Sequence, residues 1–114
     1  MTALRVLLVA VFIVLTAYTG IVIGEHGLNL LSVFFGDMAR MGWPGQFNLD
    51  FMFMLALSAL WVSWRHHFSA AGLCLGVAAF FGGALFLSVY LFIQTFRVDG
   101  QLSALLVGPD RMRP

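Results

Sequence analysis

Three long runs of uncharged, mostly apolar residues constrain this chain of 114 residues more than any other feature. Val6–Gly24 and Phe68–Phe96 contain neither a charged residue nor a histidine, and Phe51–Trp64 is a shorter run of the same kind. A helix that spans a bilayer needs about 20 mostly apolar residues. The first and third runs reach this length outright, and the second reaches it if residues 47–50 form its first turn. The pattern predicts three transmembrane helices.

The composition supports the same fold class. Hydrophobic residues make up 61% of the chain and charged residues 10%, against about 45–50% and about 25% in soluble domains. A soluble fold of this size buries only about 60% of the surface of its unfolded chain, so it cannot hide so much apolar surface. The spans must be helices, because backbone groups in hydrocarbon need internal partners and no alternation of about 10 residues indicates a barrel. We expect one all-α membrane domain over residues 1–114, and neither a soluble enzyme domain nor a disordered tail.

The connection between the first two spans has a helical pattern of its own. Apolar residues fall on one face of residues 28–41 and polar residues on the other, which predicts an amphipathic interfacial helix. The predicted elements are therefore helices at 4–24, 28–41, 47–64 and 69–97 and a tail at 98–114. Gly42-Trp43-Pro44-Gly45 is expected to end the interfacial helix. The apolar face is Leu28, Leu31, Phe34, Phe35, Met38 and Met41.

The third run is too long for a straight span. At about 1.5 Å per residue it reaches about 43 Å, against about 30 Å of hydrocarbon, so it must tilt, protrude or kink. Gly82-Gly83 is the natural kink site. Four small residues lie on one face of this helix, and such faces let helices approach closely. We expect this face to pack within the monomer rather than to form a dimer seam or a groove for a flat pigment or quinone. Its residues are Gly72, Gly76, Ala79 and Gly83.

The charges bear on partners and orientation. Six arginines face five acidic residues, and lysine is absent, so no basic patch could neutralise a row of phosphates and nucleic-acid binding is excluded. Arg5 precedes the first helix and Glu25 follows it, which favours a cytoplasmic N-terminus and an outside C-terminus in a bacterial inner membrane. The first run continues through residues 21–23 without a cleavage site, so we expect it to remain as a helix rather than to be removed as a signal peptide.

Three straight spans would place three helix ends on one side of the membrane, and those ends carry polar residues. One interpretation is a site for a ligand or proton, with Asp50 or Glu25 accepting a proton and Arg97 binding an anionic or carbonyl group. The other, which we favour, is structural: Asn48 caps the second helix, Asp50 complements its dipole, and Arg97 forms an ion pair. The seven residues are Glu25, His26, Asn48, Asp50, Tyr90, Gln94 and Arg97.

Other chemistry-bearing residues give weaker signals. His66-His67 with Cys74 is the nearest approach to a metal-binding set, but a wet histidine pair in a polar hairpin accounts for it better. One cysteine excludes an intrachain disulfide. The sequence indicates no catalytic residue and no metal site, and it identifies no cofactor.

Some of these residues carry a resemblance to a known family. Glu25-His26-Gly27-Leu28 followed by Phe34-Phe35, Asn48-Leu49-Asp50-Phe51, and Gly83-Ala84-Leu85-Phe86-Leu87 through Arg97 are similar to segments of an uncharacterised family of small bacterial membrane proteins. That family is a domain of unknown function with three predicted helices. The resemblance covers about residues 18–97 and implies an architecture rather than an activity.

The functional prediction follows from what the bundle lacks. A minimal bundle with a small-residue face and no catalytic or cofactor motif favours a non-catalytic accessory or assembly subunit of a bacterial inner-membrane complex, or a homo-oligomer. Its expected partners are the lipid bilayer and other membrane proteins or itself. Two alternatives remain open: a binding protein or enzyme for a lipid-soluble isoprenoid, carotenoid or quinone, and an oligomeric proton-coupled transporter.

Overall fold

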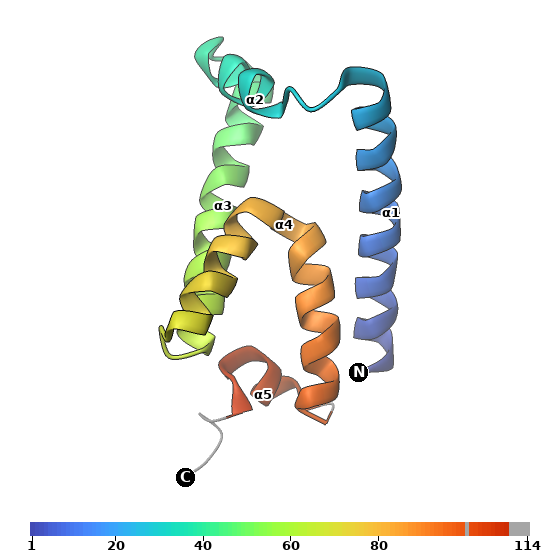
Figure 1. The fold of residues 1–114 in the computed structure, drawn as a ribbon, viewed down its shortest axis with the longest axis vertical. Coiled ribbons are helices and arrows are strands. Elements are labelled where there is room, and N and C mark those ends of the chain that lie inside the picture. Colours follow the sequence, from blue (N-terminus) through green and yellow to red (C-terminus); the bar gives the residue numbers. More distant parts are fainter. Residues whose placement is uncertain (100, 110–114) are drawn as a thin grey trace.

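A computed structural model describes residues 1–99 and 101–109, which form five helices and no strand. The helices are α1 (Thr2–His26), α2 (Leu30–Ala39), α3 (Trp43–Arg65), α4 (Ala70–Arg97) and α5 (Leu102–Val107). Together they make an elongated molecule of 51 × 27 × 23 Å (Figure 1). Three of them, α1, α3 and α4, are long and apolar enough to cross a membrane. The all-helical fold class is therefore confirmed.

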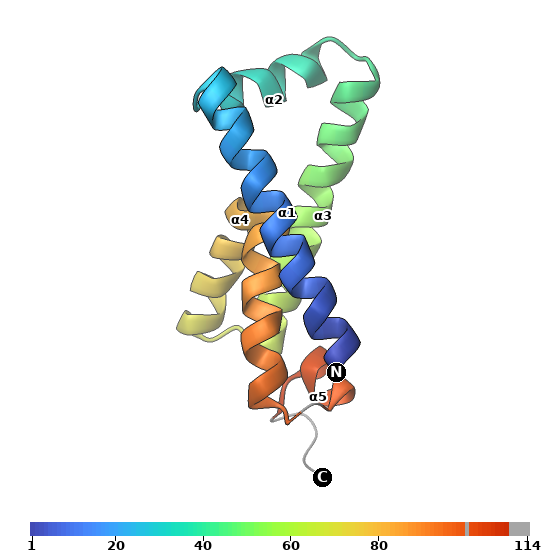
Figure 2. The same ribbon diagram turned by 90° about the vertical axis from the view of Figure 1, so that its right-hand side faces the viewer.

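The α2 helix runs across one end of the molecule between the ends of α1 and α3 (Figure 2). A short turn over residues 40–42 separates α2 from α3, and of the predicted breakers at 42–45 only Gly42 lies in it, because α3 already begins at Trp43. Pro44 is tolerated there because the first turn of a helix needs no hydrogen bond from its N–H. Gly45 permits the close crossing, since a Cβ at this position would lie 2.8 Å from the Met38 Cα.

The α4 helix is folded in two. Gly83 interrupts it with φ 57° and ψ −142°, a conformation open to glycine because it has no side chain. The first leg, residues 70–82, runs from one end of the molecule to its middle, and the second leg, residues 84–97, returns to the same end (Figure 1). Contacts with His66 require this geometry: a Cβ on Gly72 would lie 2.7 Å from the His66 Cβ, and the Tyr90 hydroxyl is 2.6 Å from His66 Nε2. Positions 72 and 90 would be about 27 Å apart in a straight helix.

This reversal corrects the expectation that the third apolar helix ends on the side where the second begins. The kink lies at the predicted glycine pair, but it turns the chain back instead of bending it slightly. The start of α1, the end of α3, both ends of α4 and α5 therefore lie together, and we call this the arginine end after Arg5, Arg65 and Arg97. The opposite end, formed by the end of α1, α2 and the start of α3, is called the α2 end.

The α5 helix occupies the tail, for which only contacts with a membrane surface were expected. Leu105 is buried at 2% exposure, whereas Leu102 and Leu106 are exposed. Ala104 and Leu105 form a small core with Val98, against which residues of α1 and α4 pack. The tail therefore folds back over the bundle and closes the arginine end.

Candidate functional site

A buried arginine organises the arginine end. Arg65 is the last residue of α3, and only 3% of it is exposed. Its Nε donates a 2.7 Å hydrogen bond to the Leu105 carbonyl, and its Nη2 donates a 3.4 Å bond to the Ala104 carbonyl. Both acceptors are in the last turn of α5, where carbonyls lack some of their helical partners, and the Ala104 carbonyl also accepts from the Gly108 N–H at 2.8 Å. Arg65 thus joins α3 to α5.

The same guanidinium reaches α4. Nη1 donates to the Tyr90 hydroxyl and to the Gln94 Oε1, both at 3.1 Å. The Tyr90 hydroxyl can then donate to His66 Nε2, 2.6 Å away, if the histidine is neutral with its proton on Nδ1. We assign this tautomer because the hydrogen bonds from Arg65 to Tyr90 and from Tyr90 to His66 can then both form. Burial lowers the pKa of His66, and the positive charges of Arg65, Arg97 and His67 lower it further, which favours the neutral form.

Two aromatic residues complete the wall of this network. The Trp61 Nε1 donates a 2.9 Å hydrogen bond to the Leu106 carbonyl. Its ring meets the edge of the Tyr90 ring at a centroid distance of 6.4 Å, and Phe86 stacks on Tyr90 at 5.8 Å. Three donors of α3, two from Arg65 and one from Trp61, therefore converge on three successive carbonyls of α5.

A second arginine connects α1 to α4. Arg5 Nε donates to the Thr95 hydroxyl at 3.0 Å, and Nη2 donates to the Thr95 carbonyl at 3.2 Å. Its guanidinium carbon lies 3.9 Å from the centre of the Phe96 ring, a cation–π contact. Because Thr95 is completely buried, this contact fixes the start of α1 against the second leg of α4.

Charge compensation differs between the two ends of the described chain. Its two ion pairs, Glu25–His26 at 3.9 Å and Asp37–Arg40 at 3.7 Å, both lie at the α2 end. Arg65 is paired with neutral acceptors: two α5 carbonyls, the Tyr90 hydroxyl and the Gln94 amide oxygen. A cation held by carbonyls at a helix C-terminus is favoured by the helix dipole, which supplies about half a negative charge.

The structure divides the seven predicted site residues between the two ends. Tyr90 and Gln94 are buried in the Arg65 network, and Arg97 is exposed beside it. Glu25 and His26 end α1 at the α2 end, and Asp50 is exposed on α3. They were expected together because the third helix was expected to cross the membrane and end on the side where the second begins. Whether any of them binds a ligand stays a prediction.

Asn48 has a role other than the predicted cap. It lies inside α3, which begins at Trp43, and its Nδ2 donates to the Phe34 carbonyl of α2 at 3.0 Å. The interpretation of Asn48 as the N-cap of this helix is therefore wrong, because the helix starts five residues earlier. Its amide instead contributes to the packing of α2 on α3.

The small-residue face packs on α3 within the monomer. A Cβ on Gly72 would meet His66, and a Cβ on Gly76 would meet the Ser63 hydroxyl and lie 3.0 Å from the Ala59 carbonyl. The four residues of this face, Gly72, Gly76, Ala79 and Gly83, are all buried.

Sequence reasoning missed Arg65, His66 and Trp61 as members of the polar site. Arg65 and His66 lie in or beside the polar hairpin, and only the return of α4 and the docking of α5 give these residues and Trp61 their polar partners. One signal was available: a two-glycine kink in a run too long for the bilayer permits a reversal, which would have brought residues 90–97 back to the hairpin.

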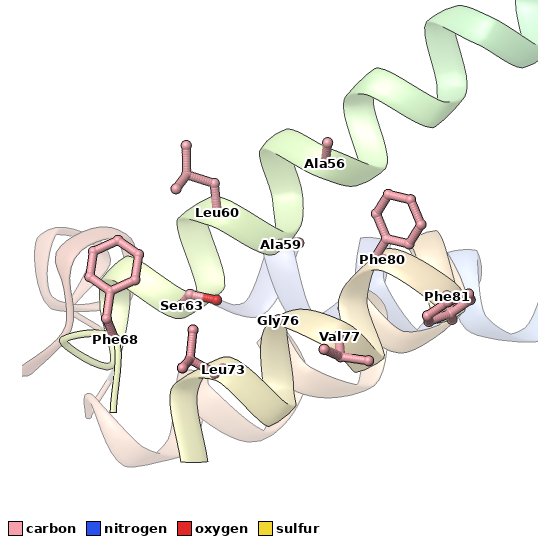
Figure 3. Close-up of a pocket in the computed structure, with 10 residues that line it drawn as sticks. All are labelled: Ala56, Ala59, Leu60, Ser63, Phe68, Leu73, Gly76, Val77, Phe80 and Phe81. Carbon is pink, nitrogen blue, oxygen red and sulfur yellow. The ribbon is translucent and has the colours of Figure 1, made fainter. Parts of the chain in front are cut away.

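The outer side of the α3–α4 seam carries an apolar groove of about 470 Å³ (Figure 3). Its floor consists of small residues, among them Ala56, Ala59 and Gly76, and its walls include Phe80 and Phe81. Ser63 supplies the polar side chain among the ten that line it. Small floors of this kind admit a closely packed helix.

Neither a metal-binding group nor a similarity to known proteins gives a further indication of function. Within residues 1–99 and 101–109, no group of three His, Cys, Asp or Glu residues could hold a metal ion. No model of a known protein family, no curated protein and no solved structure matches this chain. The resemblance to the uncharacterised membrane family therefore stays a prediction, and the function must be argued from the site itself.

Proposed function

We propose that this protein is a non-catalytic assembly subunit of a membrane complex, in which α1 and α3 cross the bilayer and α4 enters from the arginine end and returns. The observation that carries this proposal is the exposed break at the tip of α4. On one side, a Cβ on Gly83 would lie 3.4 Å from the side chains of Phe51 and Leu55, near the middle of α3. On the other side Phe81 is 82% exposed, and both Gly82 and Ala84 are exposed.

A helix break at this depth needs a partner. Each leg of α4 is about 20 Å long, so its tip would lie within the roughly 30 Å of hydrocarbon. The first N–H groups after Gly83 and the last carbonyls before it lack the partners of a continuous helix. Irregular backbone inside a membrane is tolerated only where protein covers it or water reaches it. A helix of a second polypeptide, seated against the tip and the small-floored groove, would supply the cover.

The distribution of charge supports an orientation. Arg5, Arg65 and Arg97 lie at the arginine end, and Arg40 is the arginine of the α2 end among the described residues. Because cytoplasmic segments are enriched in arginine and lysine, we place the arginine end, including the N-terminus, in the cytoplasm of a bacterial inner membrane. The C-terminal α5 then lies on the same side, in place of the outside position expected for three crossings. The α2 helix would rest at the opposite interface.

Photo-crosslinking in intact membranes tests the assembly role. Phe81→p-benzoylphenylalanine places the crosslinker at the tip, and Leu28→p-benzoylphenylalanine is the matched control, since both side chains are 82% exposed. We expect a discrete protein adduct from position 81 and none of comparable yield from position 28. An adduct of twice the 12.6 kDa chain mass identifies a second copy, and a different mass identifies a foreign subunit. Crosslinks from position 81 to lipid alone would contradict the proposal.

A further inference from the structure

The Arg65 network contains the hydrogen-bond donors of an anion site, and carbonyl groups of α5 occupy these donors. Only 3% of Arg65 is exposed, and no ion pair between described residues includes it. A buried charge that faces only neutral groups is costly, and ionisable groups inside a membrane bundle mark functional sites. The α5 carbonyls compensate this charge only in part.

The donors at this site form a convergent set. Arg65 Nε, Arg65 Nη2 and Trp61 Nε1 point at the carbonyls of Leu105, Ala104 and Leu106. A phosphate group also presents several acceptor oxygens close together, and arginine binds phosphate through two parallel N–H bonds. The three carbonyls of α5 thus stand where the oxygens of one phosphate could be bound.

The covering helix α5 is short, and two of its apolar side chains are buried. It has six residues, far below the length at which an isolated helix is stable in water. Its buried apolar residues are Ala104 and Leu105, while Leu102 and Leu106 are exposed. Gly108 allows the close approach to α3 with φ 94°, because a Cβ there would lie 2.9 Å from the Arg65 carbonyl. For α5 to leave Arg65, three hydrogen bonds from Arg65 and Trp61 and the packing of Ala104 and Leu105 must break.

We infer that α5 occupies a binding site for the phosphate of an anionic phospholipid, built from Arg65 and Trp61, and that lipid and α5 compete for these donors. This inference rests on the membrane placement proposed above but not on the assembly role. At the end of α3, Arg65 lies at the depth of lipid headgroups, and anionic headgroups attract arginine at the cytoplasmic surface. When lipid binds, α5 is released and its exposed leucines lie on the membrane.

Titration of short-chain phosphatidylglycerol into the purified full chain in neutral detergent tests this inference by calorimetry. Gly108→Ala would press a Cβ on the Arg65 carbonyl and Cγ, which weakens α5 docking while it keeps the Arg65 and Trp61 N–H donors, so we expect it to bind phosphatidylglycerol at least fivefold more tightly than the wild type. Gly36→Ala is the matched control, because a Cβ at position 36 meets nothing within 4 Å. Arg65→Gln should bind at least tenfold more weakly, and Trp61→Phe, which keeps the ring and loses the donor, about threefold more weakly.

Two further ligands separate the sources of the phosphate. Short-chain phosphatidylcholine should bind at least tenfold more weakly than phosphatidylglycerol, and inorganic phosphate should not displace the lipid at equal concentration. Unchanged affinity in Gly108→Ala, or a full preference for phosphatidylglycerol in both Arg65→Gln and Trp61→Phe, would overturn the inference. Inorganic phosphate that binds as tightly as the lipid would overturn the assignment to a lipid. Crosslinking from Phe81 is independent of all these readings, so either proposal can fail without the other.

Discussion

The two ends of this molecule are held together by different kinds of contact. At the arginine end, side-chain hydrogen bonds join residues far apart in the sequence, such as Arg5 to Thr95 and Arg65 to Leu105. At the α2 end, the ion pairs are between neighbours, Glu25–His26 and Asp37–Arg40, and all of their side chains except that of Asp37 are largely exposed. No residue of α2 is buried. The contacts that stabilise the tertiary structure are therefore concentrated at the arginine end, and the stability of the α2 end depends more on the membrane or partner around it.

Removal of the central guanidinium is the change with the largest expected effect on this contrast. Arg65→Met removes the donor of the Leu105 carbonyl and of the Gln94 amide oxygen, while the Ala104 carbonyl keeps the Gly108 N–H and the Tyr90 hydroxyl keeps His66. We expect thermal unfolding in detergent to report a loss of about 3 kcal/mol, since bonds to charged groups contribute about 1.5–3 kcal/mol each. Arg40→Met removes an arginine whose side chain is 83% exposed, and should cost about 0–1 kcal/mol. Equal losses from the two variants would abolish the distinction between the ends.

The reversal in α4 is the next feature to break. Gly83→Ala places a side chain at φ 57°, ψ −142°, at a cost of about 1–3 kcal/mol for a strained backbone. Gly24→Ala in α1 meets nothing within 4 Å, and should be neutral or stabilising by up to about 1 kcal/mol. Urea unfolding of both variants measures the difference. A stabilised Gly83→Ala variant would mean that residues 70–97 form a continuous helix.

A smaller effect is expected at the one tight crossing of the α2 end. Gly45→Ala would press a methyl group on the Asp37 carbonyl and the Met38 Cα, which we expect to cost about 1 kcal/mol, the low end for overpacking. Hydrogen exchange should accelerate in α2 and stay unchanged in α5. Faster exchange in α5 would show that the two ends are coupled, contrary to the contrast drawn above. Gly36→Ala serves again as the control on the same helix.

The smallest effect is a dependence of stability on pH. The pKa of His66 lies below its usual value because of burial and the nearby charges of Arg65, Arg97 and His67. A lowered pKa in the folded state means that the stabilising contribution is complete above the pKa of the unfolded chain and is lost as pH falls through the folded value. Acidification from pH 7.5 to pH 5 should therefore lower the melting temperature of the wild type. His66→Gln, which can still accept from Tyr90, should reduce this slope, and an unchanged slope would assign the acid sensitivity elsewhere.

The helices were largely predictable from the sequence, because length and hydropathy act locally. Apolar runs placed α1, α3 and α4 to within a few residues, and the glycine pair located the kink. The start of α3 was misplaced because Pro44 and Gly45 read as breakers, whereas proline is accommodated in a first turn and this glycine serves a close helix crossing. Local patterns do not reveal such tertiary roles.

The polar site was less predictable, because it depends on the direction of one helix. The spacing of Tyr90, Gln94 and Arg97 predicted a common inward face; Tyr90 and Gln94 are buried, whereas Arg97 is exposed. The expectation that α4 crosses the membrane sent that face to the wrong end of the molecule. A glycine pair signals that a helix can bend and not by how much, since the angle depends on tertiary packing. The partners of Arg65 in α5 lie about 40 residues away, beyond the reach of any periodicity.

The return of α4 is the central claim, and cysteine labelling tests it most directly. In a Cys74→Ser background, Thr2→Cys, Ser32→Cys and Gln101→Cys each place a thiol at an exposed position. A membrane-impermeant maleimide is applied to right-side-out and to inverted vesicles. If α4 returns, we expect position 101 to be labelled in the same vesicles as position 2 and in the opposite vesicles from position 32. Labelling of position 101 together with position 32 would show that residues 70–97 cross the membrane, and would contradict the return of α4.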